Sequence, residues 1–324
     1  MNLLLDRRQP LLSESIALER AIVETLTYFD VFDYPLRPSE LHRYLHGLHA
    51  TSASLERVLR SSLLTNQIDS RDGYIFLRSR GLTVTLREQR RIRYMRIAPR
   101  IAAYGRILSR LPFIRMVALT GSSAMQNGDG TADLDFLLVT APDRLWLARA
   151  FAILIGRWTA LSNHVLCPNV ILSERALHWS DQDLYAAHEL TQMVPLAGGQ
   201  VYTRLRAANP WALAYLPNAD HSPSDALIPD TGSPQQRLLE GALGGAFGRR
   251  LEKWEMRRKI TRLTRQNTPG AETAFNADIC QGNFNRHGAL TRHAFQERLD
   301  ALGLESPVPL LVPELVTRDT RAAG

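Results

Sequence analysis

The sequence is poor in lysine and cysteine. Only two of its 39 basic residues are lysines, Lys253 and Lys259, so arginine carries the formal net charge of +7. Such an arginine excess reflects coding bias as much as chemistry, and the charge alone does not indicate nucleic-acid binding. The two cysteines, Cys167 and Cys280, form no disulfide framework and lack metal-ligand spacing, which favours a reducing compartment.

Long uncharged apolar runs are also missing. The most apolar stretch, residues 145–162, is interrupted by Arg149 and Arg157, whereas a bilayer span needs about 20 largely uncharged residues. The apolar run within residues 1–12 is too short for a signal peptide. We therefore expect a cytoplasmic protein without a membrane contact.

Residues 1–84 are expected to form a winged-helix-like module. Apolar residues recur at helical spacing and then give way to two short strand-like runs joined by Asp72-Gly73, a pair typical of a hairpin turn. Three short helices followed by a small hairpin is the order of a winged helix. The expected elements are helices over residues 15–29, 39–48 and 54–64 and strands over 67–68 and 74–77.

Residues 85–111 are expected to form a connecting helix, kinked at Pro99, with a solvated basic face. Residues 112–216 then change to strand, turn, helix and strand, which predicts a mixed α/β (α+β) domain with a mixed sheet and flanking helices. The expected elements there are strands over residues 115–120, 133–140 and 164–172 and helices over 145–161 and 183–193.

The remaining chain is expected to be a proline-containing linker, residues 217–235, and a helical C-terminal region, residues 236–324. That region includes a strongly basic helix over residues 247–265 and an expected loop over 268–276. The basic helix is explained equally well by internal ion pairs and by attraction of phosphates.

One segment combines residue types that suit phosphate and metal chemistry. Gly121 permits a sharp turn after a strand, and Ser122-Ser123 would open a short helix whose N–H groups attract phosphate. Asp133 and Asp135 alternate on the next strand, so both carboxylates project from one face. Paired carboxylates favour a magnesium ion that also binds substrate phosphates.

Gly121-Ser122 followed at ten residues by Asp133-Leu134-Asp135 resembles the signature of the polymerase-beta-like nucleotidyltransferase superfamily. More narrowly, most of the chain is similar to bacterial nucleotidyltransferase-domain proteins of unassigned substrate. The patterns that carry this similarity are residues 25–36, 144–147, 187–189 and 209–211. The resemblance implies magnesium, or manganese in its place, at Asp133 and Asp135 and a nucleoside triphosphate held by Gly121 and Ser122.

The superfamily usually supplies a third carboxylate from the strand after the intervening helix, but that strand here contains no acid. Asn169 is the nearest equivalent, and an amide is a poor general base. Glu174 and Glu189 are the candidate substitutes, and an ordinary helical pair of His188 and Glu189 is the competing interpretation. The site either works with two carboxylates, uses a substitute or has lost catalysis.

Further candidates are weaker. Arg144 and Arg149 could reach a triphosphate, because arginine forks match phosphate geometry, and a salt-bridged role is equally plausible for each. Asp278, Cys280 and His287 lie close together in sequence, but their irregular spacing favours a structural role over a metal site.

These features predict a magnesium-dependent nucleotidyltransferase that moves a nucleoside monophosphate from a nucleoside triphosphate to an unidentified small molecule, protein or RNA. The alternative is a catalytically degenerate nucleotide-binding or scaffold protein whose winged helix docks on a partner or on DNA. DNA is the weaker partner, because the expected recognition helix offers only Arg57 and Arg60. Selection of a protein partner by the N-terminal module stays open.

Overall fold

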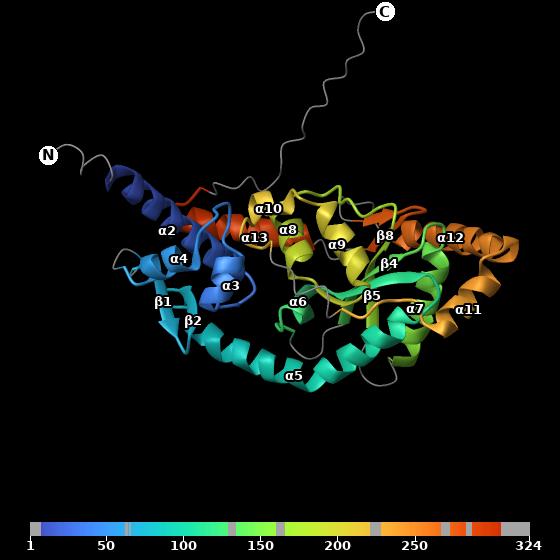
Figure 1. The fold of residues 1–324 in the computed structure, drawn as a ribbon. Coiled ribbons are helices and arrows are strands. Elements are labelled where there is room, and N and C mark those ends of the chain that lie inside the picture. The colour runs from blue at the N-terminus through green and yellow to red at the C-terminus, as the bar shows by residue number, and fades with distance from the viewer. Residues whose placement is uncertain are drawn as a thin grey trace, which may run out of the picture.

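The computed structural model describes residues 8–61, 64, 66–128, 134–159, 166–220, 228–266, 273–282 and 287–305. Within these residues the protein is a mixed α/β structure in which helices cover both faces of a six-stranded mixed sheet (Figure 1). The expected fold class is thereby confirmed at this level of detail.

The sheet has the strand order β6-β3-β4-β5-β8-β7. Only β4 and β5 pair in parallel, because helix α7 (Leu145–Thr159) connects them as a crossover, and all other neighbours are antiparallel. The strands are β3 (Ile114–Leu119), β4 (Leu134–Thr140), β5 (Leu166–Ser173), β6 (Val194–Ala197), β7 (Thr273–Phe275) and β8 (Ile279–Gly282).

Side-chain alternation along β4 divides the core into two layers. Phe136 and Leu138 pack toward one face, under α7 and the helices α5 (Leu82–Ser109) and α12 (Ala246–Gln266). Leu137 and Val139 pack toward the opposite face, and Asp135 alternates onto that face with them. The helices there include α8 (Leu184–Gln192), α9 (Gly199–Ala207), α10 (Ala212–Tyr215) and α13 (His287–Ala301).

The N-terminal region contains three helices followed by a hairpin, in the expected order. Asp72 and Gly73 both have positive φ, 55° and 77°, as a tight hairpin turn requires. A short bridge between Leu36 and Ile75 adds a third extended segment beside the hairpin. The elements are α2 (Arg8–Asp30), α3 (Pro38–Arg43), α4 (Ser52–Leu59), β1 (Ile68–Arg71) and β2 (Tyr74–Leu77).

Helix α5 continues through Pro99 and spans the distance between the N-terminal region and the sheet (Figure 1). The expectation of a solvated basic face is wrong for Arg87, which is buried. Its guanidinium binds Glu40 at 2.6 Å and lies 3.8 Å from the centre of the Tyr34 ring. This buried contact ties the connecting helix to the N-terminal region.

The C-terminal half contains more strand than expected. β6, β7 and β8 extend the central sheet, and β7 lies inside the segment 268–276 that was expected to be loop. Helix α11 (Pro234–Leu243) begins within the expected linker. Strands of three or four residues are too short to show a periodic pattern, so pairing with the sheet decides them.

No helix in the part of the chain described above is both long and apolar enough to cross a membrane.

Candidate functional site

Gly121 brings the turn after β3 into contact with Asp135. Its φ of 63° is in the left-handed region, and a Cβ added there would lie 2.9 Å from Asp135 Oδ2. The preceding residue, Thr120, donates its backbone N–H to the carbonyl of Asp135 at 2.9 Å. Glycine is therefore required both by the backbone conformation and by the carboxylate beside it.

The two serines after Gly121 have different surroundings. Ser122 is exposed, whereas Ser123 is buried within the short helix α6 (Gly121–Ala124). The chain then turns back, since Asn127 donates its N–H to the Ser122 carbonyl at 2.8 Å. An added Cβ at Gly128 would lie 3.6–3.8 Å from both serine hydroxyls. Ser122 is thus the serine whose side chain can reach a ligand.

Asn169 lies next to Asp135 because β5 contains a bulge. Phe136 pairs with Pro168 and Leu137 pairs with Val170, so Asn169 is the extra residue between two registered pairs. Its Nδ2 donates to Asp135 Oδ1 at 3.2 Å. The remaining polar atom of this amide is its side-chain oxygen, which can accept from water or bind a cation.

Glu189 comes from α8, which contacts α6. Burial, and secondly the negative charge of Asp135, raise the pKa of the Glu189 carboxyl from 4.5 to about 7. This electrostatic interaction makes Glu189 a candidate member of the same site as Asp135. Among the candidate substitutes for the third acid, Glu189 is therefore the one whose charge interacts with Asp135.

Asp133 falls outside the described residues. Among the residues that the structure describes, no three His, Cys, Asp or Glu side chains come together in a way that could hold a metal ion. The described part of the site is therefore a pair of carboxylates, Asp135 and Glu189, with the amide of Asn169 beside them. All of these are oxygen donors of the kind that magnesium prefers.

The N-terminal region holds the loop that follows α6. Tyr34 donates its hydroxyl to the Met125 carbonyl at 2.9 Å, and Arg90 donates to Asn127 Oδ1 at 3.0 Å. Both Arg90 and Asn127 Nδ2 also donate to the Phe32 carbonyl at 3.1 Å. Sequence reasoning missed these supporting residues, although Phe32 and Tyr34 lie in the segment 25–36 that carries part of the family resemblance.

A buried aromatic cluster anchors α8. His188 stacks on Tyr28 with ring centres 4.1 Å apart, and its Nε2 lies 3.0 Å from His46 Nε2. Burial, and secondly the neighbouring His46, lower the pKa of His188, which favours the neutral form of this ring. His188 therefore packs at the interface with the N-terminal region, while the adjacent Glu189 interacts with Asp135.

Three candidates lie elsewhere. Arg144 follows the far end of β4, where it donates to the Gly244 carbonyl at 3.0 Å. Arg149 lies over the Trp146 ring at 5.9 Å, on the face of the sheet opposite to Asp135. Glu174 follows the end of β5 and binds Arg204. The structure does not bring any of these side chains to Asp135.

The set Asp278, Cys280 and His287 also does not converge as a metal site among the described residues. Cys280 is buried in β8, where burial raises the pKa of its thiol. The Asp278 carbonyl accepts from the Ser173 backbone N–H at 2.8 Å, at the turn between two strands. The structural interpretation of these residues fits their positions.

No known protein-family description, curated protein or solved structure matches this chain.

Proposed function

We propose that the protein is a magnesium-dependent nucleotidyltransferase that transfers a nucleoside monophosphate from a nucleoside triphosphate to an acceptor and releases pyrophosphate. The observation that carries this proposal is the convergence of Gly121, Asp135, Asn169 and Glu189 from four separate elements. A merely solvated aspartate at a strand end needs neither the left-handed glycine against it nor a second carboxylate beside it. The surrounding sheet is proposed to be a nucleotidyltransferase fold, and residues 1–84 a winged-helix-like module.

Magnesium, or manganese, would be held by Asp135 and Glu189 with the Asn169 side-chain oxygen, and by Asp133 on the evidence of the sequence motif. Two neighbouring carboxylates repel each other without a cation, and the charge of Asp135 adds to the larger effect of burial in raising the pKa of Glu189. When bound, the metal supplies charge neutralisation for the triphosphate and the departing pyrophosphate.

Groups of the protein itself would position the triphosphate and accept the proton of the attacking hydroxyl. The backbone N–H groups after Gly121 and the exposed hydroxyl of Ser122 would orient phosphate oxygens. The carboxylate of Glu189 would accept the proton of the attacking hydroxyl. As that hydroxyl oxygen bonds to the α-phosphorus, the bond to the bridging β-phosphate oxygen breaks and pyrophosphate leaves.

The test is incubation of the protein with each labelled nucleoside triphosphate and magnesium against cell extract, followed by measurement of which size class of molecule takes up label. The double variant D133N/D135N is expected to lose transfer while keeping its fold, checked by thermal unfolding. Full activity in the double variant would show that these aspartates do not form the active site.

Glu189→Gln and Glu174→Gln form a matched pair, because both acids follow the metal motif and only Glu189 lies at the site. Transfer should fall by about 100-fold or more in E189Q, as expected for loss of a general base, and change little in E174Q. The opposite result would show that the third acid was assigned wrongly.

A specific observation favours the second candidate, a nucleotide-binding protein without catalysis. Asn169 donates to Asp135 at the position where the superfamily usually has an acid. Calorimetric titration with a nonhydrolysable triphosphate separates the two candidates: binding without transfer in any extract supports the degenerate protein, and transfer excludes it.

For the N-terminal module we propose a supporting role rather than DNA recognition. Its candidate recognition helix, α4, presents Arg57 and an Arg60 that pairs with Glu56 at 3.0 Å. The module instead makes its polar contacts with the loop after α6. A duplex-DNA gel shift across salt concentration should show no specific complex, since phosphate contacts would give steep weakening with salt.

A further inference from the structure

Helix α12 carries its positive charge on the outside of the molecule. It contains eight basic residues and two acidic ones, and both acids are buried. Glu252 accepts from the backbone N–H groups of Trp146 and Leu147 at 2.7–2.8 Å, at the start of α7. Glu255 binds Arg258 at 2.6 Å. Both acidic side chains therefore already have partners within the protein, and the exposed surface of α12 is cationic.

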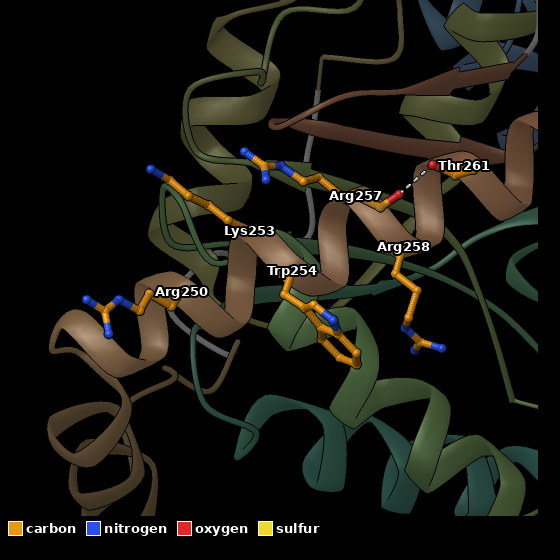
Figure 2. A pocket seen from close by; sticks show the side chains of 6 residues that line it. All are labelled: Arg250, Lys253, Trp254, Arg257, Arg258 and Thr261. Carbon is orange, nitrogen blue, oxygen red and sulfur yellow. Dashed lines mark hydrogen bonds between the residues drawn. The ribbon is translucent and has the colours of Figure 1, made fainter.

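An open depression of about 630 Å³ lies along this helix. No acid lines it, and its residues are Arg250, Lys253, Trp254, Arg257, Arg258 and Thr261. Figure 2 shows Lys253 and Arg257 projecting to one side of the helix and Trp254 and Arg258 to the other. The Arg258 guanidinium lies 5.0 Å from the Trp254 ring centre. One cation thus lies beside the tryptophan, and further cations project from the other side of the same helix.

Trp254 is 58% exposed, and Phe247, seven residues earlier, is 70% exposed. Residues seven apart lie two turns apart on one side of a helix, about 10 Å along its axis. Arg250 lies between these two rings in sequence. Aromatic rings interleaved with exposed cations are the combination with which proteins bind unpaired bases and their phosphates.

We infer that α12 is a docking surface for single-stranded nucleic acid, whose bases stack on Trp254 and Phe247 and whose phosphates contact Arg250, Lys253 and Arg257. An acidic protein could pair with the basic side chains of α12, but it would not need the exposed aromatic rings that lie among them. A nucleic-acid duplex could also pair with these basic side chains, but its bases are stacked inside the duplex and are not free to stack on aromatic rings. This docking does not depend on the proposed function.

The experiment measures fluorescence anisotropy of labelled single-stranded RNA and DNA of about 16 nucleotides, which covers the usual site sizes, without nucleotide or magnesium. Affinity should fall steeply between about 50 and 200 mM salt. W254A should weaken binding about 5- to 100-fold. R257E should also weaken binding, and it should reduce the slope of log affinity against log salt concentration by about 1. Thermal unfolding checks that each variant keeps its fold.

Arg106→Glu on α5 is the charge-matched control, since Arg106 is also exposed on a long helix. The inference is overturned if neither oligonucleotide binds at low salt, if W254A and R257E bind like the wild type, or if R106E loses as much affinity. Binding to phosphatidylserine vesicles but to neither oligonucleotide would also overturn it, in favour of a membrane surface. Binding of either oligonucleotide that W254A and R257E weaken and R106E does not supports the inference, and preference between RNA and DNA identifies the strand.

Discussion

Gly121 leaves room for the carboxylate of Asp135 in the candidate site. Any side chain at position 121 meets Asp135 Oδ2 at 2.9 Å while the backbone stays in a left-handed conformation. Gly121→Ala should therefore lower the free energy of unfolding by about 1–3 kcal/mol and weaken triphosphate binding by displacing the carboxylate. Urea denaturation and calorimetric titration measure the two effects.

Gly241→Ala is the matched control for that substitution. Gly241 lies within α11 and has open space around its Cα, so alanine there should add about 0.5–1 kcal/mol of stability through helix propensity. Equal effects of the two substitutions would contradict the importance of the left-handed turn.

Glu189 predicts a pH dependence with a definite sign. Its pKa is about 7 in the folded protein and 4.5 in the unfolded chain, so the folded state holds the proton more tightly between these values. Without magnesium, the free energy of unfolding should fall as pH rises from about 4.5 to about 7 relative to E189Q. Denaturation curves of both proteins across this range measure the difference.

Magnesium should counteract that loss, because a cation favours the deprotonated carboxylate. The stabilisation by magnesium is therefore expected to grow as pH rises through about 7 in the wild type and to be nearly constant with pH in E189Q. A magnesium effect with the same pH profile in both proteins would place Glu189 outside the metal site.

At the scale of elements, α5 and α8 link the N-terminal region to the site. Arg90 on α5 holds the loop after α6 through Asn127, and α8 is anchored by His188 while it presents Glu189. Neither Arg90 nor His188 is proposed to touch substrate, so both are positioning residues.

Arg90→Gln should release the loop after α6. Loss of its bonds to Asn127 and the Phe32 carbonyl is expected to cost about 1–3 kcal/mol and to speed hydrogen exchange over residues 121–128. The KM for triphosphate should rise more than kcat falls, since the loop orients phosphate. Arg96→Gln, an exposed position on the same helix, serves as the control and should leave exchange in this loop unchanged.

At the scale of the whole molecule, the N-terminal helices and the sheet share one core. Buried side chains of α2 and α3 belong to the same apolar cluster as Leu137 and Val139 of β4. The polar bonds from Tyr34 and Arg90 cross the same junction. One hydrophobic core therefore continues across the domain boundary that was expected after residue 84.

Removal of residues 1–84 should consequently destabilise the rest of the chain, because it uncovers the face of the sheet that carries Asp135. The full chain is expected to unfold in one cooperative transition, and residues 85–324 alone should bind a dye for exposed apolar surface. Calorimetry of both proteins tests this. Cooperative unfolding of the truncated chain at an unchanged temperature would show that the two parts are independent.

The sequence by itself determined the features that depend on short spacings. Alternation placed Asp135 on a strand face, helical periodicity located α2, α7 and α12, and Asp72-Gly73 predicted the hairpin. The sharp turn at Gly121 after β3 was likewise predictable, because a turn constrains only a few neighbouring residues. The mixed α/β class followed from the order of these local patterns.

Only the tertiary structure decided which distant side chains meet. Asn169 reaches Asp135 through a bulge that leaves no periodic signal, and Glu189 arrives from a helix much later in the chain. Arg144 and Arg149 follow the acidic strand in sequence, yet strand direction and sheet face separate them from it. Contacts between remote segments depend on packing of the whole core, which local residue patterns do not encode.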